Sequence, residues 1–259
     1  MQIGNSSAKK WSIVLATVLA ITIGHAPAWA DNFTLTFSGA NAFSGAGSTG
    51  SLTANFFDVN NGTCGGVANQ TGVCLVITSN LATNSGIQEN VDPGKGFYFN
   101  LTEAESTSAS ILSGLAFTEE AFTGGFSTAA TLSTGDDAFK ADGLTGQFEV
   151  NLTWGPSIKA FTNGESQTYL ITDSGGTIAA DDFLSLSDID GSPLGGCNPT
   201  DMGSCIAAVH IQNTGSNGQD SGWEAGTLAV ATPEPNAIAM TLFGCGLIYL
   251  FRRKHGQRA

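Results

Sequence analysis

Short runs in which apolar and polar residues alternate recur along the chain, and they constrain its fold more than any other feature. In the clearest run, Phe148, Val150, Leu152 and Trp154 alternate with polar residues. A period of two places every second side chain on one face, so this run predicts a half-buried β-strand. Eight other runs are read as strands: Phe33–Phe37, Leu52–Val59, Val73–Thr78, Gly96–Leu101, Phe126–Leu132, Thr168–Thr172, Ile206–Gln212 and Gly226–Val230.

Turn signals separate these runs, and composition disfavours helices. The turn signals are Asn61-Gly62, Asp142-Gly143, Asn163-Gly164 and Asp190-Gly191. Gly, Ser, Thr and Asn are abundant, and these residues favour turns and exposed strand faces. Many short strands without a βαβ rhythm or a fixed-period repeat predict an all-β fold, a β-sandwich of jelly-roll type. Helices are expected only at Glu103–Leu115 and Ala179–Leu186.

The N-terminus has the three parts of a secretory signal peptide. Lys9 and Lys10 precede an apolar run, Trp11–Gly24, and Ala28-Trp29-Ala30 forms a small-x-small cleavage site before Asp31. The alternative is a permanent membrane helix, for which the run is short. We therefore expect residues 1–30 to form a signal helix that is removed on export.

The C-terminal tail also has three parts. Pro233-Glu234-Pro235 is extended because proline fixes φ and removes backbone donors. Ala237–Phe251 is uncharged and mostly apolar, and Arg252, Arg253 and Lys254 end it, as expected where a membrane helix meets the cytoplasm. A helix of this length reaches about 22 Å, so it is a short membrane helix. The alternative is a buried helix of a soluble domain, which the basic end disfavours.

This order of elements in residues 233–258 resembles the PEP-CTERM sorting signal of Gram-negative bacteria. The resemblance implies export, transient anchoring in the inner membrane and cleavage near Pro233-Glu234-Pro235 by an exosortase. It further implies delivery to the cell surface or the exopolysaccharide matrix, and no catalytic activity. Cys245 within the helix and the short apolar stretch depart from the pattern.

The net charge of the middle of the chain limits the classes of partner that this part can bind. Residues 31–232, taken as one β-sandwich domain, contain three lysines, no arginine and 21 acidic residues, a net charge of −18. Binding to the phosphate backbone of nucleic acid depends on cationic side chains that displace counterions, so the charge argues against nucleic acid and anionic membrane surfaces as partners. The tail, residues 233–259, and the signal peptide carry all the other basic residues. The sequence thus predicts an acidic exported domain between two terminal signals.

Four cysteines of this domain predict disulfides in an exported chain. The expected pairs are Cys64 with Cys74 and Cys197 with Cys205, which are ten and eight residues apart. The sequence alone also admits other pairings, or a zinc site with four cysteine ligands, although no two cysteines have the usual zinc spacing.

Acidic residues in glycine-containing loops suggest a calcium site. One group is Asp136, Asp137 and Asp142; the other is Asp188 and Asp190, with Asp201 further along. Carboxylate oxygens are the ligands that Ca²⁺ prefers, although neither group fits the EF-hand pattern. A solvated acidic loop is the alternative.

Other chemistry has weaker support in the sequence. His210 is the single histidine of the domain and lies in a strand-like run, so a structural role is expected and not a catalytic triad. Trp154 and Trp223 suit either core packing or stacking on sugars, and Glu149 is the best-placed strand carboxylate for a glycosidase. We expect a non-enzymatic surface or matrix protein; the alternatives are a calcium-assisted carbohydrate-binding or glycoside-cleaving sandwich, and a structural protein that self-associates through an edge strand.

Overall fold

A computed structural model of the chain describes residues 32–82, 85–88, 95–102, 109–124, 130–144, 147–154, 159–186, 188–189, 192–193, 205–214 and 220–228. Contacts divide the chain into two units, Met1–Leu228 and Ala229–Ala259, and every described residue lies in the first. The predicted signal peptide and sorting tail therefore lie outside the described residues. Within the described part, no helix is long and apolar enough to cross a membrane.

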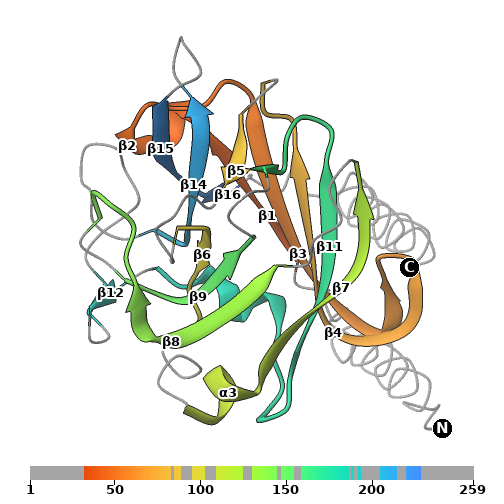
Figure 1. Cartoon of the computed structure of the whole chain (residues 1–259). Coiled ribbons are helices and arrows are strands. Elements are labelled where there is room, and N and C mark those ends of the chain that lie inside the picture. Colours follow the sequence, from red (N-terminus) through yellow and green to blue (C-terminus); the bar gives the residue numbers. More distant parts are fainter. Residues whose placement is uncertain are drawn as a thin grey trace, which may run out of the picture. The chain divides into compact units, whose positions relative to one another are not determined.

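Two antiparallel sheets build the described domain (Figure 1). The first sheet has the order β16 (Thr227–Leu228), β1 (Asn32–Ser38), β3 (Ser51–Cys64), β4 (Val67–Ser79), β11 (Ser166–Asp173) and β7 (Leu115–Thr123). The second has the order β10 (Lys159–Ala160), β5 (Gly86–Gln88), β14 (Ala207–Thr214), β6 (Phe97–Phe99), β9 (Phe148–Thr153) and β8 (Thr131–Phe139), with β15 (Asp220–Ala225) joining β14 to β2 (Ala42–Gly45). A separate pair consists of β12 (Asp188–Ile189) and β13 (Ser192–Pro193). The predicted all-β sandwich is confirmed.

Helices are short in the described residues, as predicted. They are α3 (Ala109–Gly114) and two 3₁₀ turns, η1 (Gly39–Asn41) and η2 (Ala180–Leu184). The helix predicted at Glu103–Leu115 ends at Gly114, one residue earlier than predicted, because Leu115 begins β7 and pairs with Asp173 of β11. Pairing with a neighbouring strand therefore overrides the local preference of this segment.

The core lies between the sheets and consists of the residues that alternation places inward. From the first sheet, Phe37 and Phe56 contact Phe97 and Phe99 of the second sheet, with ring centroids 4.9 Å and 5.3 Å apart. Phe56 also stacks on Phe183 of η2 at 5.1 Å. These edge and stacked contacts add to the hydrophobic gain of burying the rings. The period-two pattern thus identified the core face correctly.

The prediction that β9 is half-buried is wrong. All six of its residues are buried, including Glu149 and Asn151 on the side away from the core. A second apolar cluster, which contains Tyr98, Phe148 and Trp223, packs on the second sheet. Tyr98 pairs with Asn151 across the strands, so this cluster adjoins the outer face of β9. Alternation alone does not show that later segments cover a polar face.

The β3–β4 hairpin turns later than predicted. Asn61, with φ +53°, lies in an irregular part of β3, and the chain reverses at Gly65-Gly66, both with positive φ. A Cβ on Gly65 would lie 2.6 Å from Cβ of Glu120, so the tip rests against β7. The end of the hairpin therefore curls across the first sheet (Figure 1).

A disulfide fixes this curled hairpin. Cys64 and Cys74 are bonded, with Cα atoms 5.7 Å apart, which confirms the predicted pair. Both are buried beside Val59 and Leu170, away from the main core. Cys205 is disulfide-bonded too, and its partner lies outside the described residues, so the pairing with Cys197 remains a prediction.

We expect replacement of both Cys64 and Cys74 by alanine to lower the free energy of unfolding by roughly 2 to 3 kcal/mol, because the open chain regains loop entropy when unfolded. Urea titration of the full-length chain under non-reducing conditions measures this, with Cys245→Ala as the control. Equal midpoints for the double variant and the parent would contradict the expectation.

Candidate functional site

The first sheet splits at one end, and this split creates a hollow. Pairing between β4 and β11 ends at Val73 and Ile171. Beyond that point β4 still pairs with β3 as far as Thr71 and further, while β11 still pairs with β7 as far as Asp173. A Cβ on Gly72 would lie 2.3 Å from the Ile171 carbonyl oxygen, so glycine permits the close approach at the base of the split. The β3–β4 hairpin and the β7–β11 strand pair therefore diverge from a tightly packed point.

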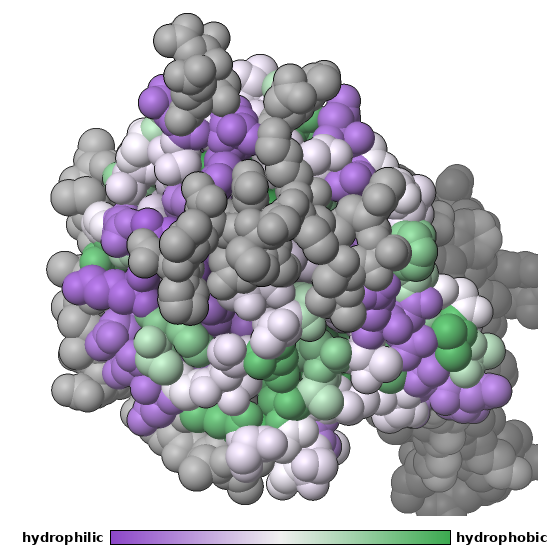
Figure 2. All heavy atoms as spheres, in the orientation of Figure 1, coloured by the Kyte–Doolittle hydropathy of each residue, from purple (hydrophilic) through white to green (hydrophobic). Residues whose placement is uncertain are grey.

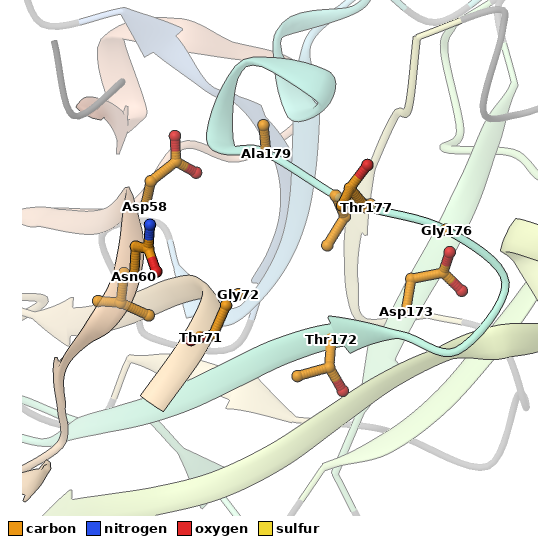
Figure 3. A pocket seen from close by; sticks show the side chains of 11 residues that line it. Asp58, Asn60, Thr71, Gly72, Thr172, Asp173, Gly176, Thr177 and Ala179 are labelled. Carbon is orange, nitrogen blue, oxygen red and sulfur yellow. The ribbon is translucent and has the colours of Figure 1, made fainter. Parts of the chain in front are cut away.

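The segment that follows β11 closes the split into a hollow of about 390 Å³ that is open to solvent on one side. In Figure 3, Asp58 and Asn60 lie on one side, and Asp173 and Thr177 lie on the other. Six of the eleven lining residues have polar side chains, while apolar atoms form the larger part of the wall: Asp58, Val59, Asn60, Thr71, Gly72, Thr172, Asp173, Gly176, Thr177, Ile178 and Ala179.

Carboxylates hold the covering segment in place. Asp58 Oδ1 accepts the N–H of Ala180 at 2.8 Å, and Asp182 Oδ2 accepts the N–H of Ala179 at 2.7 Å. Burial raises the pKa of Asp182, the Ala179 N–H lowers it, and the negative charges of Asp181 and Asp58 raise it further. These bonds satisfy backbone donors at the start of η2, where a helical turn leaves its first N–H groups without partners.

Asp173 is the second carboxylate of the hollow. Its Oδ1 accepts the N–H of Gly175 at 2.9 Å and thereby shapes the covering segment. Its Oδ2 is buried and makes no hydrogen bond. No Lys, Arg, His or Cys is among the lining residues. The hollow therefore offers hydrogen-bond acceptors and hydroxyls but no nucleophile paired with a base.

The residues predicted to bind calcium are only partly described. Asp136 and Asp137 lie in β8, at an irregularity where Asp137 has φ +47°. Asp142 follows β8 and makes an ion pair with Lys95 at 3.3 Å. Asp188 lies in β12, and Asp190 is outside the described residues. The described part contains no group of three His, Cys, Asp or Glu residues that would hold a metal ion. Calcium binding stays a prediction.

His210 lies outside the hollow, on the second sheet. It is 5% exposed and packs against Trp223 with ring centroids 5.0 Å apart. Its Nδ1 makes no hydrogen bond, so the described residues show no acid partner for a catalytic triad at this nitrogen. Burial, and next the positive charge of Lys95, lower its pKa to about 4, against the opposing effect of Asp142. His210 is thus a neutral core residue near pH 7.

The other residues considered for sugar chemistry are buried. Trp154 is 1% exposed and Trp223 is 2% exposed, so neither is available for stacking on a sugar. Trp154 Nε1 donates to Gln167 Oε1 at 2.9 Å, within the core. Glu149 is 3% exposed, and its Oε2 accepts the N–H of Leu101 at 3.0 Å. For both tryptophans, core packing was the correct alternative.

Comparison of the chain with protein-family models, curated proteins and solved structures finds no match.

The sequence patterns did not predict the residues of the hollow, although the sequence contains one signal for them. Asp58 follows Phe56 and Asp173 follows Ile171 by two positions, so each carboxylate continues a core-facing row of apolar residues. Charges in such rows indicate that the core ends there and that a polar space begins.

We expect His210 to make stability pH-dependent. Its pKa is about 4 when folded, against an ordinary value of 6.5, so its neutral form stabilises the fold above pH 6.5. That contribution, on the order of 3 kcal/mol, is lost as the pH falls from 6.5 towards 4.

Unfolding of the parent and of His210→Gln, compared by urea titration between pH 7.5 and 4.5, isolates this effect. The difference in unfolding free energy between the two proteins is compared because a second group also titrates. Burial raises the pKa of Glu224, so its contribution to stability changes with pH in the opposite direction to that of His210. A constant difference across this range would contradict the expectation.

Proposed function

We propose that the chain is an exported, non-enzymatic protein that resides at the cell surface or in the exopolysaccharide matrix after both terminal signals are removed. The observation that carries this proposal is the buried Cys64–Cys74 disulfide, supported by the second bonded cysteine, Cys205. Disulfides of this kind form and persist in oxidising compartments outside the cytoplasm. An exported destination is also what the signal peptide and the tail predict from the sequence.

The proposed route follows from the resemblance of the tail to the PEP-CTERM signal. Residues 1–30 direct export, and residues 233–259 anchor the chain transiently in the inner membrane, with Arg252, Arg253 and Lys254 on the cytoplasmic side. An exosortase is the processing partner, and it cuts near Pro233-Glu234-Pro235. Exopolysaccharide is the partner at the destination, and nucleic acid is not a partner of so acidic a domain.

The jelly-roll form of the sandwich is part of this proposal. It is supported by the way in which the chain crosses between layers, from β4 in the first sheet to β5 in the second, back to β7, and again from β10 to β11. A cell-surface role is compatible with such a fold without specifying an activity, because sandwiches serve many functions.

Among the alternatives, glycoside cleavage receives no support from the described residues. Glu149, the best candidate for a catalytic carboxylate, is buried and accepts a hydrogen bond from the Leu101 N–H. Retaining and inverting glycosidases both need two carboxylates that reach the scissile bond. Carbohydrate binding keeps a specific observation in its favour, namely the hollow at the split of the first sheet, which combines polar side chains with an apolar wall.

Self-association through an edge strand has mixed support. Strands β7 and β8 end their sheets, and hydrophobic residues gather over β8 and α3 on the face in Figure 2. However, β7 carries Glu119 and Glu120 at its centre, and acidic side chains on an edge strand oppose its pairing with a second copy.

We expect the intact mass of the protein released by its host to lack residues 1–30 and everything beyond about Pro235. Replacement of Pro233, Glu234 and Pro235 by alanine should leave the tail attached and the protein in the membrane fraction. Retention of the C-terminal segment in the released parent protein would refute this account of sorting.

The predicted calcium site gives a further test. If Asp136, Asp137, Asp142, Asp188 and Asp190 contribute ligands, millimolar calcium should raise the thermal midpoint, because a ligand that binds only the folded state stabilises it. The midpoint is measured in calcium and then in EDTA, with magnesium as the control. Identical midpoints would remove calcium from the proposal.

A further inference from the structure

We propose that the hollow between β3–β4 and β11–β7 binds an uncharged saccharide unit by hydrogen bonds to the sugar hydroxyls. This inference rests on the proposed function, because residence in a polysaccharide matrix supplies the ligand. The ligand class itself follows from the chemistry, the charge and the size of the hollow.

The lining presents hydrogen-bonding groups of both kinds. Asp58 carries carboxylate acceptors, Asn60 carries an amide with two donors and an acceptor, and the exposed Thr177 carries a hydroxyl that donates or accepts. Asp173 adds its negative charge, but its Oδ1 accepts the Gly175 N–H and its Oδ2 is enclosed by protein; the Thr71 hydroxyl already accepts the N–H of Asn61. A sugar hydroxyl also donates and accepts at once, so several neighbouring hydroxyls can satisfy such a mixed lining. Bonds from hydroxyls to carboxylates are charge-assisted and are stronger than bonds between neutral groups.

The split of the sheet adds backbone groups to this lining. Beyond Val73 and Ile171, the edges of β4 and β11 that face each other are no longer paired as strands. Thr71 and Gly72 on one edge, and Thr172 on the other, line the hollow. Strand edges present N–H and C=O groups in alternation. A ligand with both donors and acceptors matches them, whereas a purely apolar ligand would leave them unsatisfied.

Charge excludes acidic ligands. Two carboxylates and no cationic side chain line the hollow. The surrounding domain has only three lysines against 21 acidic residues, and one of them, Lys95, is paired with Asp142. A uronic acid or a phosphorylated sugar would therefore be repelled at short range. The matching ligand is a neutral hexose unit.

Size and shape agree with a small unit. A volume of about 390 Å³ lies at the lower end of the range for small-molecule sites, about 300 to 1,000 Å³. Val59, Ile178 and Ala179 contribute apolar wall to this space. Such a wall suits the C–H face of a sugar ring, while the polar residues address its hydroxyls.

Calorimetric titration of the full-length chain tests the inference, in a detergent without a sugar headgroup and with EDTA present. The probes are glucose, galactose and mannose, together with glucuronate and galacturonate. We expect saturable binding of at least one neutral hexose and at least tenfold weaker binding of the uronates.

Two variants connect that binding to the hollow. Asp58→Asn keeps an acceptor for the Ala180 N–H but removes the charge, and should weaken binding about tenfold. Thr177→Val keeps the shape of an exposed side chain and removes one hydroxyl, and should weaken binding several-fold. The matched control is Asp181→Asn, an exposed aspartate of η2 that does not line the hollow and should bind like the parent.

The inference is overturned if no hexose binds, if uronates bind as well as hexoses, if binding requires calcium, or if the control weakens binding as much as Asp58→Asn. Thermal midpoints of the variants close to that of the parent separate loss of a contact from loss of the fold. A chain that is released with the expected mass but binds no hexose overturns the binding site alone and leaves the sorting proposal intact.

Discussion

The packing of Phe56 is the contact on which most of the described structure depends. Its ring is fully buried, stacks on Phe33 of the neighbouring strand and meets Phe99 of the opposite sheet. On another side it stacks on Phe183 of η2. One side chain thus joins two strands, two sheets and the segment that covers the hollow. Losing a buried phenylalanine of this kind typically costs about 3 to 5 kcal/mol, a large fraction of a domain's stability.

This position also explains why the hollow lies where it does. Two residues after Phe56, the same face of β3 presents Asp58, whose carboxylate binds the backbone of η2 at Ala180. The contact between Phe56 and Phe183 anchors η2 to the core, and the Asp58 carboxylate fixes the first turn of η2. An apolar contact and a hydrogen bond from the same strand therefore hold η2 in place. The hollow is the space that remains where the apolar rows end and the β3–β4 hairpin diverges from the β7–β11 strand pair. The mixture of polar side chains and apolar wall in its lining is therefore a consequence of where the core stops.

Sequence patterns predicted the sandwich, the core face of β1 and β3, the short helix at η2 and the Cys64–Cys74 bond, because each depends on local periodicity or spacing. They could not predict the coverage of β9, since the cluster around Tyr98 and Trp223 is assembled from distant segments. The hollow was missed for a related reason. Asp58 and Asp173 are 115 positions apart in the chain, and only the register of the three neighbouring strands β3, β4 and β11 brings them to one site.

The disulfide connects the proposed destination to the proposed binding site. The loop that Cys64 and Cys74 close contains Thr71 and Gly72, which form one edge of the hollow. Strand pairing with β3 positions this edge, and closing the loop favours the paired state because it restricts the conformations of the unfolded chain. In the reducing cytoplasm the same edge lacks its covalent constraint. In the proposed route, export therefore does more than deliver the domain, because it supplies the oxidising conditions under which the hairpin that borders the hollow gains this stabilisation.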